Sequence, residues 1–226
     1  MTPKKHKPTR PYGGIDARER RKARQEAFVK AGLEAFGTTG YVNSTIKDIC
    51  EIAGLTQRYF YESFRSKEDL LVAVYRKLIE DIESEARVIF EQCKDSPEDM
   101  VYKLLKMFYQ RFKDDRRLVR VQLFEVLGVS PRVDSEYQSA MSTLTDWIKL
   151  TMFSVFPGLQ EKCRDGAVIF TGLAGAMIQI AHQWVAEGLT IPVEEVVYQT
   201  SNMFFVLGKY YKASPKNPSK MTMHPS

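Results

Sequence analysis

The sequence predicts an all-α protein of about nine helices, divided into a small N-terminal part and a larger C-terminal part. Apolar residues recur at helical spacing through most of the 226 residues, and no segment alternates polar and apolar residues as a strand would. Helix start signals stand before many of these segments, such as Ser96-Pro97 and Ser130-Pro131. With 44% hydrophobic residues, the chain is able to bury a substantial core.

The N-terminus is strongly basic. Residues 1–14 (MTPKKHKPTRPYGG) lack apolar periodicity and are rich in Pro, Gly and Lys, which predicts a disordered basic arm. A helix is expected from Asp16, its N-cap, to Phe36, and Gly37 and Gly40 end it. Residues 1–30 carry a surplus of seven positive charges, whereas the rest of the chain carries a deficit of two. This location favours contact with a polyanion; a merely solvated flexible tail is the alternative.

The stretch from Thr45 to Leu70 predicts two short helices that cross at a tight turn, followed by the start of a third. Thr45 is a suitable N-cap with Asp48 as its capping-box partner, and Thr56 and Ser66 are expected to cap the next two helices. Gly54 stands where the chain must turn, because glycine adopts the left-handed conformation without cost. Inward-facing residues are expected at Ile46, Ile49, Ile52, Phe60 and Phe64.

This arrangement predicts a helix-turn-helix. Two closely crossing helices need a small residue at the crossing, a glycine at the turn and an apolar anchor, and Cys50, Gly54 and Phe60 fill these roles. The outward face of the second helix then carries Gln57, Arg58, Tyr61 and Glu62, with Tyr59 at its edge. Arg and Gln suit bidentate contacts with guanine and adenine, and Tyr suits phosphate. An ordinary helical hairpin with a solvated polar face is the alternative.

The C-terminal part is expected to consist of helices only. The helix that begins at Ser66 runs to Glu91 and joins the two parts of the chain. Further helices are expected over residues 96–112, 116–128, 130–156, 160–188 and 192–211, and the tail 213–226 is expected to be disordered. The most apolar stretch, Gly166–Ala181, is shorter than the ~20 residues of a membrane span, so a buried helix is expected there.

The string around the two short helices resembles the TetR family of transcriptional regulators. That family's pattern is matched by Thr45-Ile46, Ala53-Gly54-Leu55-Thr56, Tyr61, Phe64 and Ser66-Lys67-Glu68, with Phe36 and Gly40-Tyr41 upstream. Cys50, Arg58 and Ser63 depart from the family's commonest residues. Cysteine is small enough for the crossing, and Arg58 adds a contact that affects operator sequence. The resemblance covers residues 20–70 and places the helix-turn-helix domain at 15–70 and the ligand-binding and dimerisation domain at 92–212.

The resemblance implies that the protein binds double-stranded DNA. Phosphate contacts are expected from Thr45, Tyr61 and Lys67, with Thr56 also at the DNA, and base contacts from Gln57, Arg58 and Tyr59. Residues 4–24 are expected to add phosphate or minor-groove contacts. The chain is expected to be a repressor that a small hydrophobic ligand releases from a palindromic operator.

The resemblance also implies a homodimer through the last two long helices and a ligand pocket in the C-terminal domain. Small residues at Gly172, Ala174, Gly175 and Ala176 allow helices to approach closely, although packing within one subunit is the alternative. Apolar dimer contacts are expected from Ile169, Leu173, Met177, Ile180, Val196, Val197, Met203, Phe204 and Val206. Candidate pocket residues are Met107, Phe108, Phe112, Phe124, Trp147, Met152, Phe170 and Met177, with His182 and Trp184 as polar handles.

Other functions have less support in the sequence. No motif for a catalytic site, cofactor or metal occurs, so neither an enzyme nor a cofactor is expected. Cys50, Cys93 and Cys163 lack metal-ligand spacing, which indicates reduced thiols in a cytoplasmic protein. The alternative is a helical protein that binds a ligand or a membrane surface without reading DNA, but the basic segment lacks the apolar face of an interfacial helix.

Overall fold

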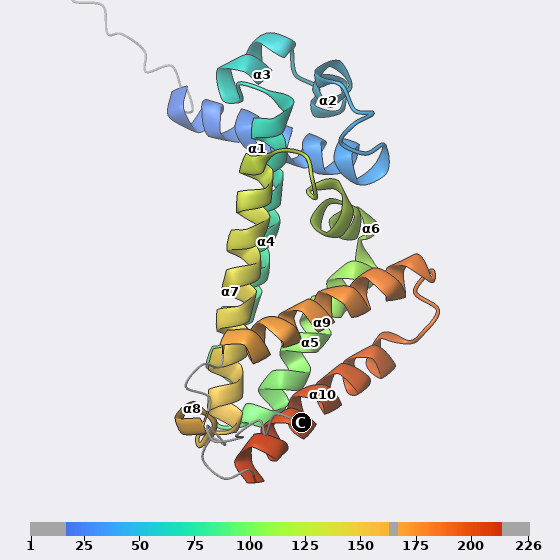
Figure 1. Ribbon diagram of the computed structural model, residues 1–226. Coiled ribbons are helices and arrows are strands. Elements are labelled where there is room, and N and C mark those ends of the chain that lie inside the picture. The colour runs from blue at the N-terminus through green and yellow to red at the C-terminus, as the bar shows by residue number, and fades with distance from the viewer. Residues whose placement is uncertain (1–16, 163–166, 214–226) are drawn as a thin grey trace, which may run out of the picture.

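The computed structural model describes residues 17–162 and 167–213. Every regular element within these ranges is helical, which confirms the predicted all-α class (Figure 1). The basic arm, the N-cap expected at Asp16, Cys163 and residues 214–226 lie outside the described residues.

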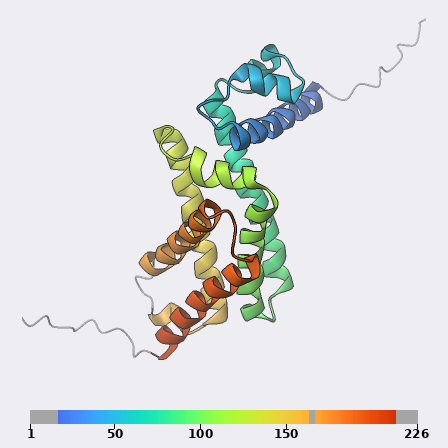
Figure 2. The ribbon, with the colours of Figure 1, turned by 90° about the vertical axis from the view of Figure 1, so that its right-hand side faces the viewer.

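The helices form two groups along the chain. The N-terminal group consists of α1 (Ala17–Thr38), α2 (Ile46–Ala53), α3 (Gln57–Ser63) and the start of α4 (Lys67–Gln92). The C-terminal group consists of α5 (Pro97–Asp114), α6 (Arg116–Val119), the π-helical turn η1 (Arg120–Glu125), α7 (Pro131–Val155), α8 (Leu159–Lys162), α9 (Ala167–Ala186) and α10 (Val193–Ala213). Figures 1 and 2 show the first three helices at one end of the molecule and α8 at the other.

Two expected helices differ in the structure. The segment 116–128 is divided into one α-helical turn and the π-helical turn η1, and the segment 160–188 contains two helices, α8 and α9. The structure has two hydrophobic clusters: the N-terminal cluster contains Phe28 and Phe60, and the C-terminal cluster contains Phe108 and Phe170. Val121 of η1 belongs to the N-terminal cluster, and Leu123 belongs to the C-terminal cluster. Residues two apart in a helix point to opposite sides, so this segment contributes side chains to both clusters.

An aromatic cluster holds the N-terminal helices together. The Phe28 ring packs edge-on against Phe60 and Phe64, with ring centroids 5.4 and 6.3 Å apart. Phe28 and Phe60 are completely buried, as are Phe36 and Ile49. Burying each of these side chains stabilises the fold by ~1.5–3 kcal/mol, so this cluster fixes α3 on α1 and α2.

Helix α4 belongs to both groups. Its first turns bury Leu70 and Leu71 in the N-terminal cluster, and its later turns face α5 and α7. The N-cap Ser66 accepts a hydrogen bond from Asp69 N at 3.1 Å, as predicted. Figure 1 shows α4 and α7 side by side along the length of the molecule. The same helix therefore connects the helix-turn-helix with the C-terminal core.

A second connection is made by α6 and η1 against the end of α1. Arg117 forms an ion pair with Glu34, and Arg120 donates hydrogen bonds to the carbonyl oxygens of Thr38 and Thr39. The approach is close, because a Cβ at Gly37 would lie only 2.8 Å from Cα of Arg117.

The C-terminal core is formed by α10 packed on α5 and by α9 packed on α7. By length and composition alone, α9 could cross a membrane. In the structure, Phe170, Ala174 and Trp184 of this helix are buried in the core. This outcome agrees with the expected buried helix and leaves only one face of α9 exposed.

Gly208 lies against the ring of Phe156 in this core, so a substitution there tests the packing. An added Cβ would overlap the ring of Phe156, so we expect Gly208→Ala to lower the free energy of unfolding by ~1–3 kcal/mol. Urea unfolding followed by circular dichroism measures the change. Gly158→Ala is the matched control, since no atom lies within 4 Å of its Cβ position; equal midpoints for the two variants would contradict the predicted overlap.

Candidate nucleic-acid interface and ligand cavity

The crossing of α2 and α3 has the predicted geometry. Thr45 and Asp48 form a reciprocal capping box, with bonds of 2.9 and 3.2 Å, and these bonds lower the pKa of Asp48 below its ordinary value. Gly54 has φ 64° and ψ 28°, the left-handed conformation that ends α2. Cys50 is buried at the crossing, and burial raises the pKa of its thiol. The turn therefore presents α3 at a fixed angle.

The outward face of α3 is exposed as predicted. Gln57, Arg58 and Tyr61 are all exposed, whereas Phe60 is completely buried beneath them. The Arg58 side chain is 85% exposed and forms an i,i+4 ion pair with Glu62 at 3.1 Å. This face offers an amide, a guanidinium and a phenol side by side, which are the groups that read base edges and bind phosphate.

Glu62 joins α3 to α1 through an ion pair and a hydrogen bond. Its carboxylate lies 3.1 Å from Arg58 Nε and 3.7 Å from Arg24 Nη2, and its carbonyl oxygen accepts from Arg21 Nη2 at 3.3 Å. The Arg24 guanidinium also lies over the Tyr59 ring, 4.5 Å from its centroid. Sequence reasoning placed Glu62 on the outward face but assigned it no role, because its partners lie about 40 residues away in α1.

One expectation for this region is wrong. Ile52 does not face inward but is 48% exposed, because Cys50 and Ala53 occupy the inner face of α2 instead. Thr56 is the N-cap of α3, as predicted, although its side chain makes no capping hydrogen bond.

Lys67, which is expected to contact phosphate, has hydrogen-bond partners within the chain. Its ammonium donates to the carbonyl oxygens of Tyr41 at 2.6 Å and Ser44 at 2.8 Å, with a longer contact to Val42 at 3.4 Å. It also lies 4.4 Å from the centroid of the Tyr41 ring. Partial burial lowers the pKa of Lys67. All three donors face backbone oxygens, so Lys67 holds the 41–44 turn that precedes α2.

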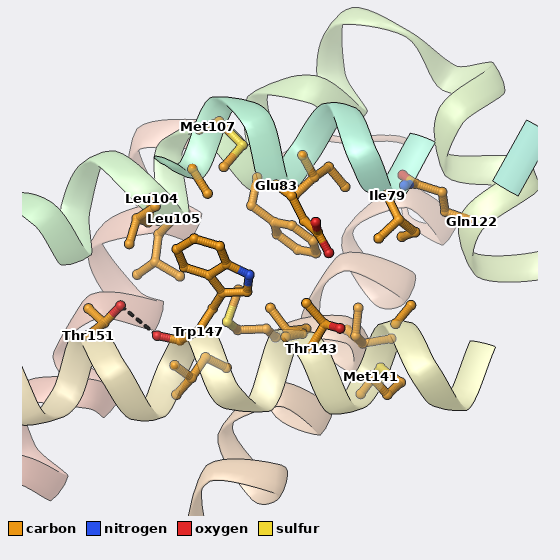
Figure 3. A pocket seen from close by; sticks show the side chains of 18 of the residues that line it. Ile79, Glu83, Leu104, Leu105, Met107, Gln122, Met141, Thr143, Trp147 and Thr151 are labelled. Carbon is orange, nitrogen blue, oxygen red and sulfur yellow. Dashed lines mark hydrogen bonds between the residues drawn. The ribbon is translucent and has the colours of Figure 1, made fainter. Parts of the chain in front are cut away.

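A cavity of about 130 Å³ lies among the helices of the C-terminal core. It is bounded mainly by α4, α5 and α7, and Figure 3 shows Trp147 and Met107 projecting into it from α7 and α5. Five predicted pocket residues line it: Met107, Phe108, Phe112, Trp147 and Met177. The volume is close to that of the ~150 Å³ engineered cavity that binds benzene.

The other predicted pocket residues lie elsewhere. Met152 is completely buried in the core, and Phe170 packs edge-on against Phe153 at 5.5 Å. Phe124 is 45% exposed and stacks on His182 at 4.6 Å, outside the cavity. Burial lowers the pKa of His182. Trp184 Nε1 donates to the carbonyl oxygen of Ile191 at 2.8 Å, so this group has a structural partner.

The polar residues of the cavity were missed. Glu83, Gln122, Thr143 and Thr151 line the otherwise apolar wall. Thr151 donates to the carbonyl oxygen of Trp147 at 2.8 Å, the bond drawn in Figure 3. Gln122 is only 5% exposed, and its Oε1 has no hydrogen-bond partner. No sequence signal marks these residues, because single polar residues within amphipathic helices ordinarily face solvent.

The last two long helices share their apolar residues between the core and the surface. Leu173, Met177, Val196, Val197 and Phe204 are buried within the chain, which corrects their expected role as dimer contacts. Other apolar residues remain exposed: Val168, Tyr198, Met203, Val206 and Tyr210. No atom lies within 4 Å of a Cβ added at Gly172 or Gly175, so the exposed face of α9 is open to a close approach.

Comparisons with known proteins agree with the N-terminal geometry. Residues 28–74 match the family model described as bacterial regulatory proteins, tetR family. The chain is 22% identical over 177 residues to the uncharacterized HTH-type transcriptional regulator YerO of Bacillus subtilis, covering 76% of this chain but 60% of that protein. It is 23% identical over 193 residues to the HTH-type transcriptional activator FasR of Mycolicibacterium smegmatis, covering 84% and 86% of the two chains.

A solved structure shares the fold over most of the chain. It is a transcriptional regulator FadR from Bacillus subtilis in complex with stearoyl-CoA, with a TM-score of 0.65 at 14% identity. The match covers 79% of this chain and 96% of that one. The resemblance to the TetR family and the two-part helical architecture are thereby confirmed.

Lys67→Met tests the structural role of this ammonium. We expect the free energy of unfolding to fall by ~1–3 kcal/mol, because the carbonyl oxygens of Tyr41 and Ser44 lose their donor. Urea unfolding measures the effect. Lys47→Met, at an exposed position of α2, is the control. If Lys67→Met were as stable as the unmodified chain, the hydrogen bonds from Lys67 to these carbonyl oxygens would not contribute to the free energy of unfolding.

Proposed function

Since residues 28–74 carry the DNA-binding domain of the TetR family of bacterial regulatory proteins, we propose that the chain is a non-enzymatic, cytoplasmic repressor. A dimer binds a palindromic operator, and a small apolar ligand in the C-terminal cavity releases it. The observation that carries the proposal is the exposed face of α3 above the buried Phe60, held on a domain that shares α4 with the cavity. An exposed helix of this kind enters the major groove.

The division of roles on this surface follows from side-chain chemistry. We assign base contacts to Gln57 and Arg58, with Tyr59 at the edge, because amide and guanidinium groups form bidentate bonds with adenine and guanine. The hydroxyls of Thr45, Thr56 and Tyr61 contact phosphates. Residues 4–24 add further phosphate or minor-groove contacts. Lys67 is left out of this set, since its ammonium is bonded to backbone oxygens.

A dimer through α9 and α10 places two such surfaces on one DNA. Val168 of α9 and Met203 and Val206 of α10 are exposed in the described part of the chain, and Gly172 and Gly175 leave α9 open to a partner's backbone. A two-fold dimer presents its recognition helices to successive major grooves, ~34–36 Å apart. The symmetry of the dimer is the reason for a palindromic operator.

The ligand is apolar or amphipathic. The cavity wall consists mainly of aromatic, Leu, Ile and Met side chains. The FadR structure of similar fold contains stearoyl-CoA, which supports an elongated apolar ligand that enlarges the cavity. The proposal assigns the cavity to binding rather than catalysis.

Selection of duplexes from a random-sequence pool tests DNA recognition. We expect one palindromic sequence to be enriched and to be retained over random DNA as salt is raised, while overall affinity falls steeply. Binding of all duplexes with equal affinity at every salt concentration would contradict sequence-specific recognition.

Substitutions on α3 separate base contacts from phosphate contacts. We expect Gln57→Ala and Arg58→Ala to relax sequence preference at the contacted bases, by ~1–3 kcal/mol for each lost contact. Tyr61→Phe removes one hydroxyl and is expected to weaken binding similarly on every sequence. Competition binding with single-base variants of the selected duplex measures both effects. Uniform loss in all three variants would reject this assignment.

Val206→Glu tests the dimer. Val206 is 68% exposed on α10, and an unpaired charge buried in an interface is costly, so we expect dimer affinity to fall roughly 30-fold or more. Analytical ultracentrifugation measures the equilibrium. Val88→Glu introduces the same charge at a 53% exposed residue of α4 and is expected to leave it unchanged. If the monomer–dimer equilibrium of Val206→Glu were unchanged, the interface would not include this part of α10.

A further inference from the structure

The π-helical turn η1 connects the ligand cavity with the DNA-binding domain. Three successive residues of this turn reach three different places: Val121 the N-terminal hydrophobic cluster, Gln122 the cavity and Leu123 the C-terminal cluster. All three are at least 95% buried. A π turn within a helix is uncommon and is frequently found at functional sites.

Gln122 is a buried polar residue of the cavity wall. The residue is 95% buried, and its Oε1 accepts no hydrogen bond from the residues that the structure describes. Figure 3 shows the Gln122 amide at one end of the cavity, with Ile79 between it and the carboxylate of Glu83. Buried polar groups are nearly always hydrogen-bonded, so an unpaired amide oxygen on a residue of the cavity wall indicates a missing donor.

Arg120 and Glu125, on either side of Gln122, form hydrogen bonds with the DNA-binding domain. Arg120 donates to the carbonyl oxygens of Thr38 and Thr39, and its Nε lies 2.8 Å from Glu125 Oε1. The other carboxylate oxygen of Glu125 accepts from Tyr41 N at 2.7 Å. These hydrogen bonds therefore attach the end of α1 and the segment that follows it to η1.

The same segment is bound from α4 by Lys67. Its ammonium donates to the carbonyl oxygens of Tyr41 and Ser44, and Ser44 precedes the N-cap of α2. A displacement of η1 thus reaches the first helix of the helix-turn-helix through two adjacent sets of hydrogen bonds. Arg120 also lies close to Gly40, where a Cβ would be 2.6 Å from Nη2.

We propose that Gln122 recognises the ligand through a hydrogen bond that Oε1 accepts, and that η1 transmits this contact to the DNA-binding domain through Arg120 and Glu125. The ligand is then an apolar molecule that carries one hydrogen-bond donor, such as a hydroxyl group. This inference rests on the proposed function, and it adds the chemistry of the ligand and the residues that couple the two domains.

Two isomeric probes test the recognition step without DNA. Benzyl alcohol and anisole have the same atoms, but only the alcohol carries a donor. Ligand-observed NMR titrations of the full chain measure the ratio of their dissociation constants. We expect Gln122→Met to reduce the preference for the alcohol about tenfold, the value of one lost hydrogen bond. Gln110→Met makes the same substitution on α5 at a residue that does not line the cavity, and it is expected to leave the ratio unchanged.

A structural role for Gln122 would give different results. Replacing an unpaired buried amide with an apolar side chain of similar shape is neutral or stabilising, so the thermal midpoint of Gln122→Met should not fall. An unchanged preference in Gln122→Met, a loss of preference in Gln110→Met, or equal binding of both probes by the unmodified chain would overturn the assignment.

The coupling step is measured on the duplex chosen by selection. We expect saturating benzyl alcohol to weaken DNA binding by the unmodified chain at least fivefold. Saturated Gln122→Met should show less than a twofold change. Arg120→Met should retain the preference for the alcohol yet lose its effect on DNA. A wild-type response in either variant would exclude η1 as the connection.

These experiments also separate the two proposals. If no duplex is enriched, the proposed function fails, while the NMR preference still tests Gln122. If a duplex is enriched but the preference is independent of residue 122, only the further inference fails.

Discussion

The end of α1 lies against the α6–η1 segment so closely that Gly37 has no room for a side chain. A Cβ at Gly37 would lie 2.8 Å from Cα of Arg117, and one at Gly40 would lie 2.6 Å from Nη2 of Arg120. Gly40 also has φ 96°, a conformation that other residues rarely adopt. This contact allows Arg120 to reach the carbonyl oxygens at the end of α1, and it holds the helix-turn-helix in one orientation on the C-terminal domain.

The helix-turn-helix is therefore attached at two places, α4 and η1. Helix α4 carries Leu70 and Leu71 in the N-terminal cluster and Ile79 in the cavity wall. The turn η1 carries Val121 in the same cluster and Gln122 in the same cavity. A ligand that separates these two walls changes both attachments together. Packed interiors do not deform continuously, so such a change favours a shift of the whole domain over a local adjustment.

Features that depend on neighbours in sequence could be predicted, whereas those that depend on distant partners could not. The Thr45 capping box, the left-handed Gly54 and the buried Phe60 each follow from local geometry, and the structure contains all three. The ammonium of Lys67 binds carbonyl oxygens 23 to 26 residues away, which no local pattern reveals. The π turn breaks the 3.6-residue period itself, so a periodic analysis assigns Gln122 to an ordinary helix face.

Two polar residues, one in each domain, differ in how completely their hydrogen-bonding capacity is used. Glu62 is paired with Arg58 and Arg24, which neutralises its charge beside the proposed phosphate contacts and fixes α3 before DNA arrives. Gln122, in the wall of a nearly apolar cavity, has an oxygen without a hydrogen-bond partner in the described part of the chain, at a cost of ~1–3 kcal/mol. Because that cost is relieved only by a donor inside the cavity, a ligand that supplies one binds the chain more tightly than an apolar molecule of the same shape. The exposed surface of α3 is thus organised before DNA binds, whereas the cavity gains its missing hydrogen-bond donor only when the ligand binds.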